Sequence, residues 1–152
     1  MNILFIHQNY PGQFREYVPK LAASGQHKVA FLTRRRDLPQ AADHFVGIYE
    51  SAHRPKPDAW IYSRWFETAV GNGAGAAAAC KLLNENGFVP DLVSGHANWG
   101  ELLFVKDIWP DTAVIGLFEY YFLSKGGLVG FDPEFSGARD TPQLLFVNNA
   151  SI

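Results

Sequence analysis

Short apolar runs alternate along the chain with longer segments in which apolar residues recur every three or four positions. A short apolar run between turn residues is typical of a buried strand, and the longer spacing is typical of an amphipathic helix. The short runs predict strands over residues 2–7, 28–33, 45–49, 91–96 and 113–119.

The longer segments predict helices over residues 14–22, 59–86 and 100–109. Gly25 and Gly87 follow the first two segments, where a glycine commonly ends a helix. Pro19 interrupts the first segment, which predicts either a kink or a later helix start. Alanines 76–79 favour helix in the middle of the second segment.

Strands that alternate with helices indicate βαβ units and an α/β fold. We expect a Rossmann-like, doubly wound, mainly parallel sheet flanked by helices, with strand order near 3-2-1-4-5 and right-handed crossovers. Ligands of such sheets bind outside the carboxyl ends of the strands, at the switch point. The turns His7–Gln13, His96–Gly100 and Glu119–Tyr121 should therefore converge on one site.

Composition narrows the class of protein. A chain of 152 residues suits one domain, here residues 1–152. Its 13 Lys and Arg residues nearly balance 15 Asp and Glu residues, which gives no electrostatic case for a nucleic-acid partner. Cys80 is the single cysteine, so a reducing compartment such as the cytoplasm is expected. The sequence shows no signal peptide and no apolar stretch long enough to span a membrane.

The last residues, "DTPQLLFVNNASI", begin like a helix with Asp140 or Thr141 as N-cap and Pro142 at the first helical position. The pattern stops after about two turns without a C-cap signal. We interpret the chain as a fragment of a longer protein; the alternative is a natural C-terminal helix that frays.

The first turn, "HQNYPGQ", has two interpretations. Gly12 lets the backbone approach a ligand closely, and the N–H groups at the start of the following helix would form an anion site without a lysine. Alternatively, Pro11 and Gly12 simply make a β-turn, with Asn9 and Tyr10 as turn and packing residues. The turn alone does not decide between them.

The stretch "SGHANWGE" places His96 at the end of a buried strand. An imidazole there can bond a sugar hydroxyl or a phosphate, or move a proton near neutral pH, and the alternative is a buried structural histidine. Trp99 offers a ring for stacking on a sugar, and Gly100 is expected to open the next helix. Glu101 would then complement the helix dipole.

In "LFEYYF", Glu119 lies where the fifth strand should leave the sheet, so its carboxylate can bind sugar hydroxyls or cap a neighbouring loop. Tyr120 would wall an acceptor groove or belong to the core. The run "TRRRD", residues 33–37, is typical of a solvated face and at most of a weak contact with anionic lipid. The run "GNGAGA", residues 71–76, lacks a preceding strand, so we interpret it as close helix packing rather than a nucleotide loop. No metal-ligand spacing is present.

Two long segments carry a resemblance to a known family. "MNILFIHQNYPGQFREYVPKLAASGQHKVAFLT" resembles the opening of bacterial family 4 group glycosyltransferases of the GT-B fold, and "PDLVSGHANWGELLFVKDIWPDTAVIGLFEYYF" is similar to a second signature of that subgroup. The stretch "GFDPEF" matches a third. Together they cover essentially the whole chain. Ala97 and Asn98 depart from the pattern, which has Pro-Gly at this point.

The resemblance implies the N-terminal, acceptor-side domain of a retaining enzyme that moves a sugar from a nucleotide-sugar donor to a saccharide or lipid-linked acceptor. The C-terminal domain, which holds most donor contacts, would be missing, and this fragment alone would be inactive. The reaction would need no metal or other cofactor. Gly12 and Gln13 would lie near the donor diphosphate, and the catalytic His96 near the transferred sugar. We assign further substrate contacts to Asn9, Trp99, Gly100, Glu119 and Tyr120.

Members of the family often build cell-surface polysaccharide, which implies a cytoplasmic enzyme that could contact the inner membrane face peripherally. Two other interpretations stay open. One is a stand-alone Rossmann-like module that binds a small sugar or phosphorylated ligand. The other is an interaction domain that self-associates through exposed aromatic surface.

Overall fold

The structure, a computed structural model, describes residues 1–38 and 43–119. Within them, β1 (Asn2–Ile6), β2 (Lys28–Thr33), β3 (Phe45–Ile48), β4 (Leu92–His96) and β5 (Ala113–Leu117) form one sheet. The strand order is β3-β2-β1-β4-β5 and every neighbouring pair is parallel. The expected Rossmann-like architecture and strand order are confirmed.

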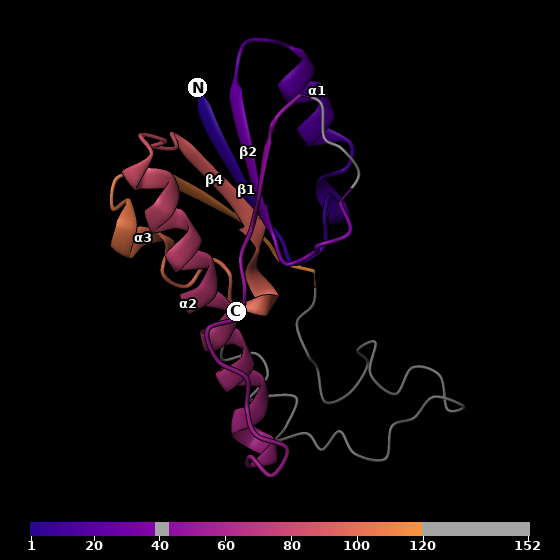
Figure 1. Ribbon diagram of the computed structural model, residues 1–152, viewed down its shortest axis with the longest axis vertical. Coiled ribbons are helices and arrows are strands. Elements are labelled where there is room, and N and C mark those ends of the chain that lie inside the picture. Colours follow the sequence, from indigo (N-terminus) through magenta and orange to yellow (C-terminus); the bar gives the residue numbers. More distant parts are fainter. Residues whose placement is uncertain (39–42, 120–152) are drawn as a thin grey trace, which may run out of the picture.

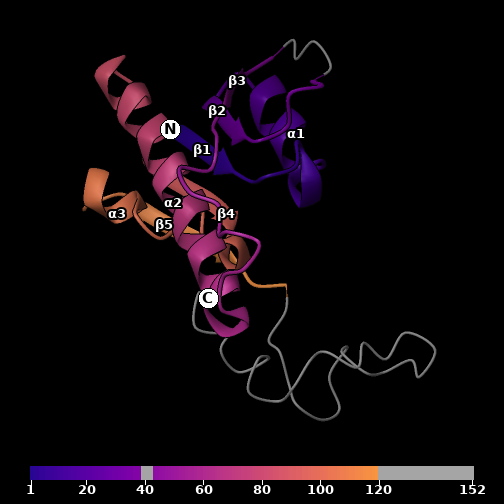
Figure 2. The ribbon, with the colours of Figure 1, turned by 60° about the horizontal axis from the view of Figure 1, so that its bottom comes forward.

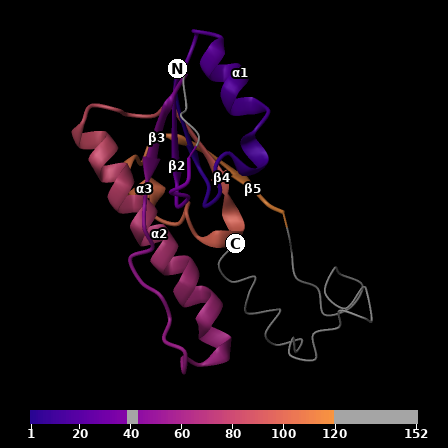
Figure 3. The ribbon, with the colours of Figure 1, turned by 45° about the vertical axis from the view of Figure 1, so that its right-hand side comes forward.

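Helices cover both faces of the sheet. The short helix α1 (Tyr17–Ala23) lies on one face, and α2 (Ile61–Glu85) and α3 (Val105–Ile108) lie on the other (Figure 1, Figure 2, Figure 3). Because successive residues of a strand point to opposite faces, each central strand supplies both cores. Phe5 and Phe31 pack with Val18 on the α1 side, whereas the core on the α2 side holds Leu4, Leu32, Val93, Ala76 and Cys80.

The glycines of α2 allow other backbone segments to lie against this helix. A Cβ atom on Gly75 would overlap the carbonyl oxygen of Glu50, and one on Gly71 would overlap that of His53. A Cβ on Gly73 would lie 2.6 Å from the carbonyl oxygen of Gly100. The run of residues 71–76 lies inside the helix, so its interpretation as close packing rather than a nucleotide loop is confirmed.

The first helix starts later than its first apolar residue. A 3-10 turn covers Gly12–Phe14, and α1 begins only at Tyr17. Pro19 is therefore the third residue of α1, where an N–H group would have no partner within the helix. The sequence predicted either a kink at Pro19 or a later helix start, and the structure has the later start.

The expected helix over residues 100–109 is wrong. A 3-10 turn covers Ala97–Trp99, Gly100 adopts the left-handed conformation with φ 91°, and the α-helical part is only Val105–Ile108. Glu101 consequently does not complement a helix dipole. It is buried, and its Oε1 accepts a hydrogen bond from the hydroxyl of Tyr49 at 2.8 Å.

We expect Tyr49→Phe to lower the free energy of unfolding by about 1–3 kcal/mol near neutral pH, because the substitution leaves a buried carboxylate without its donor. Burial already raises the pKa of Glu101, and the Tyr49 hydroxyl opposes that rise. The loss should therefore be larger at pH 8, where more of the carboxyl group is ionised, than at pH 5. Urea unfolding at both pH values measures it; equal losses would contradict this account.

Candidate functional site at the carboxyl ends of β1 and β4

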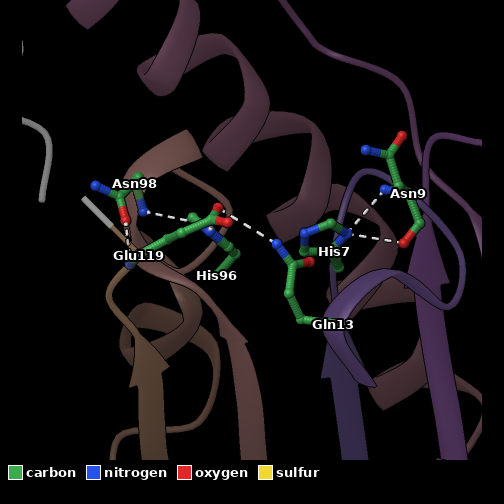
Figure 4. Close-up of polar contacts among 6 residues, drawn as sticks. All are labelled: His7, Asn9, Gln13, His96, Asn98 and Glu119. Atoms are coloured by element: carbon green, nitrogen blue, oxygen red, sulfur yellow. Dashed lines mark hydrogen bonds and ion pairs between the residues drawn. The ribbon is translucent and has the colours of Figure 1, made fainter. Parts of the chain in front are cut away.

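Two histidines meet where the adjacent strands β1 and β4 end. His7 follows β1 directly, and His96 is the last residue of β4. Ile6 is paired with Gly95 in the sheet, so the next residue of each strand lies at the same level. The two ring centroids are 5.5 Å apart with an edge-on arrangement, and both side chains are buried. This is the switch point at which the sequence predicted convergence (Figure 4).

The contacts of His96 fix its hydrogen positions. Its Nδ1 accepts a hydrogen bond from the backbone N–H of Asn98 at 3.2 Å. In the neutral ring the proton is therefore on Nε2, which donates to Oε2 of Glu119 at 2.9 Å. The ring is completely buried, so within the described residues both of its nitrogens are engaged in holding the loops around it.

Glu119 joins the turns that follow β1, β4 and β5. Its Oε2 accepts hydrogen bonds from His96 and, at 3.3 Å, from Nε2 of Gln13. Its backbone N–H donates to Oδ1 of Asn98 at 3.2 Å. The side chain is 36% exposed, and its Oε1 has no hydrogen-bond partner among the described residues. Figure 4 shows the carboxylate between His96 and Gln13. The carboxylate of Glu119 thus has Oε2 engaged in hydrogen bonds, whereas Oε1 can accept one from a ligand.

His7 is the least satisfied polar group of the cluster. Its Nδ1 lies 2.8 Å from the carbonyl oxygen of Asn9 and 3.0 Å from the N–H of the same residue. Its Nε2 is buried and has no hydrogen-bond partner in the described part of the chain. Burial lowers the pKa of His7, and the nearby His96 adds to the lowering, against the opposing effects of Asn9 and Glu119.

Gly12 is required where the first turn passes over His7. It has a φ of 54°, and a Cβ atom on it would lie 2.7 Å from Nδ1 of His7. The N–H of Phe14 closes the turn on the carbonyl oxygen of Pro11, whereas those of Gly12 and Gln13 donate to no described residue. Since α1 starts only at Tyr17, the expected α-helix N-terminus directly after the glycine is wrong. Two free N–H groups stay available there.

Of the other predicted site residues, some lie beside the two histidines and others do not. Trp99 lies beside the cluster, with its ring centroid 6.1 Å from that of His96 and 5.0 Å from that of Trp65 on α2. Gly100 does not open a helix; it is buried against α2. Asn9 turns its backbone toward His7 and its side-chain amide away from it (Figure 4). Tyr120 lies outside the described residues.

Sequence reasoning did not assign His7 and Asn98 to the site. The predicted strand order already placed β1 beside β4, and a histidine at the end of each strand was the available signal for His7. No local pattern marks Asn98 as a site residue. Its side chain is buried and ties the turn after β4 to the start of the segment after β5.

We expect His7 to lower the stability of the chain as the pH drops below 6.5, the ordinary pKa of histidine. The unfolded state takes up a proton on His7 before the folded state does, so stability is lost as pH falls from 6.5 toward the lowered folded pKa. Because Glu101 contributes the opposite slope, the test compares unfolding of the wild type with His7→Gln between pH 7 and pH 5. The free energy of unfolding of the variant should fall less between pH 7 and pH 5 than that of the wild type. An equal fall in both proteins would contradict the lowered pKa of His7.

A family model described as "Glycosyl transferase family 4 group" matches residues 25–152. This chain belongs to the glycosyl transferase family 4 group. The matched range contains His96, Trp99, Gly100 and Glu119, and it begins after the turn that carries Gly12 and Gln13. No curated protein matches the chain.

Family membership supports a glycosyltransferase role for the protein. Within residues 1–38 and 43–119, no three His, Cys, Asp or Glu side chains are grouped so that they could hold a metal ion. No helix in the same part of the chain is long and apolar enough to cross a membrane.

Proposed function

We propose that this family 4 protein moves a sugar from a nucleotide-sugar donor to a saccharide or lipid-linked acceptor with retention of anomeric configuration. In this proposal residues 1–152 supply the acceptor-side half of the cleft, and a C-terminal domain supplies most donor contacts. The single observation that carries it is the joining of His96, Glu119 and Gln13 by hydrogen bonds at the edge where β1 and β4 end.

The first turn is suited to the donor diphosphate. The backbone N–H groups of Gly12 and Gln13 donate to no described residue, and both residues are at least partly exposed. Each hydrogen bond to a charged oxygen contributes roughly 1.5–3 kcal/mol. Donors that are already in place before the bond breaks stabilise the charge that develops on the leaving group. The proposal therefore assigns the departing diphosphate to this turn and includes no metal ion.

Glu119 and His96 are suited to the transferred sugar. Oε1 of Glu119 is free to accept a hydrogen bond from a sugar hydroxyl while Oε2 is held by His96 and Gln13. His96 thus positions the carboxylate. Trp99 is half-buried beside His96, and we assign its ring to the wall of the same subsite.

The test is transfer to a panel of saccharide and lipid-linked acceptors, or donor hydrolysis, by the full-length gene product with a panel of nucleotide sugars. Residues 1–152 are assayed in parallel. We expect turnover of one donor by the full-length protein and none by residues 1–152 alone. No turnover by either, together with tight binding of a sugar or phosphorylated ligand by residues 1–152, would replace this proposal with a binding module.

A further inference from the structure

A pocket rich in arginine adjoins the site on the side of β2 and β3. Its volume is about 380 Å³, within the usual range for small-ligand pockets. It lies where the chain leaves β1, β2 and β3, and the charged residues in its wall are Arg34, Arg35, Arg36, Arg54 and Glu50. Four guanidinium groups thus face one carboxylate.

Two of these arginines are neutralised within the protein. Arg35 forms a two-pronged ion pair with Asp37, with Nε–Oδ1 and Nη2–Oδ2 distances of 2.9 Å. Arg36 pairs with Glu50.

The other two have no anionic hydrogen-bond partner. Arg34 donates to the neutral amide of Asn72 at 3.0 Å, and Arg54 makes no hydrogen bond or ion pair with a described residue. Burial raises the pKa of Glu101 and the charge of Arg34 opposes that rise, but the hydrogen bond of this carboxyl group is to Tyr49. The pocket therefore has two guanidinium groups available for an anion.

Asn9 connects this pocket to the reaction site. Its backbone contacts His7, and the residue also lines the pocket. Figure 4 shows the side-chain amide directed away from His7. The pocket therefore adjoins the turn after β1, and the ring of His7 in that turn packs against the ring of His96.

We propose that this pocket binds a phosphate group of the acceptor, so that the acceptor is a phosphorylated sugar; this rests on the function proposed above. Arg34 and Arg54 come from different loops, and a phosphate has enough charge and oxygens to bind both forks. A carboxylate has its two oxygens occupied by a single guanidinium group. A neutral saccharide would leave the charges of both guanidinium groups without an anion. A soluble sugar phosphate and a lipid-linked sugar phosphate carry the same group.

The direct test is titration of residues 1–152 with inorganic phosphate at constant ionic strength, followed by backbone amide signals of residues 34–36. Constant ionic strength removes nonspecific screening effects. We expect saturable shifts, and binding about tenfold or more weaker in Arg54→Gln. Arg15→Gln removes the same charge from an exposed arginine outside the pocket and should bind as the wild type does. No saturable shift, or equal weakening in both variants, would overturn the proposal.

A second test separates this proposal from the proposed function. The full-length protein is assayed with soluble sugar phosphates and, separately, with polyprenyl-linked sugar phosphates in vesicles. Arg54→Gln should raise the KM for the acceptor about tenfold or more in the productive arm and leave the KM for the donor unchanged. Transfer only to unphosphorylated acceptors overturns the pocket proposal alone. Phosphate binding without any transfer overturns the pocket's role toward an acceptor together with the proposed function.

Discussion

Gly100→Ala is expected to lower the free energy of unfolding by about 2–5 kcal/mol. Gly100 has a φ of 91°, a conformation that costs alanine about 1–2 kcal/mol. The added Cβ would also lie 2.6 Å from the Cα atom of Ala69 and overlap that residue's carbonyl oxygen. The backbone of α2 would have to move away from the turn that follows His96. Denaturant unfolding of residues 1–152 measures the loss.

Gly87→Ala is the matched control for the backbone part of this effect. Gly87 has a φ of 79°, and nothing lies within 4 Å of the position its Cβ would occupy. Only the conformational cost applies there, so we expect a loss of about 1–2 kcal/mol. Equal losses in the two variants would mean that the packing of Gly100 against α2 contributes nothing.

Glu119→Ala in the full-length enzyme is expected to lower kcat/KM about 10-fold to 100-fold. The substitution removes the proposed acceptor of a sugar hydroxyl, and a hydrogen bond to a charged group contributes about 1.5–3 kcal/mol. Because the substitution leaves the Nε2–H of the buried His96 without its acceptor, the free energy of unfolding should fall by about 1–3 kcal/mol. Steady-state transfer kinetics and denaturant unfolding of the same samples separate the two effects.

Glu16→Ala controls for the loss of one negative charge. Glu16 is exposed beside Lys20 and Arg15, outside the site. This variant should transfer sugar at the wild-type rate. An equal loss of activity in Glu16→Ala and Glu119→Ala, or full activity of Glu119→Ala, would remove Glu119 from the proposed site.

The fold was predictable because its central strands β1 and β2 are buried on both faces. Residues 3–6 and 29–32 are continuous apolar runs, and the structure buries them almost completely. Right-handed crossovers then leave few arrangements, and the expected strand order was confirmed. The convergence of the turns after β1 and β4 followed from that order alone.

Features that depend on contacts between distant segments were not predictable. The segment from Gly100 has the composition of a helix, but the approach of α2 forces a left-handed residue there, so the helix shortens to Val105–Ile108. Burial of Glu101 against Tyr49 follows from the same approach and has no local signal.

The arginine pocket shows the same limit. Residues 33–37 were interpreted as a solvated charged face, because the sequence does not show what lies beside them. The structure brings Arg54 and Glu50 to their side through the end of β3 and the loop that follows. Arg35 and Arg36 are ion-paired, whereas Arg34 donates to a neutral amide. The sequence alone could not show which of these three consecutive arginines lacks an acidic partner.

The most direct test of the account is the turnover number of His96→Ala in the full-length protein at saturating nucleotide sugar. His27→Ala, before β2 at the opposite edge of the sheet, is the matched control. We predict a decrease in kcat of about 10-fold to 100-fold for His96→Ala, because the carboxylate of Glu119 loses its buried donor, and none for His27→Ala. A folded His96→Ala protein with wild-type turnover would contradict the claim that sugar transfer occurs where β1 and β4 end.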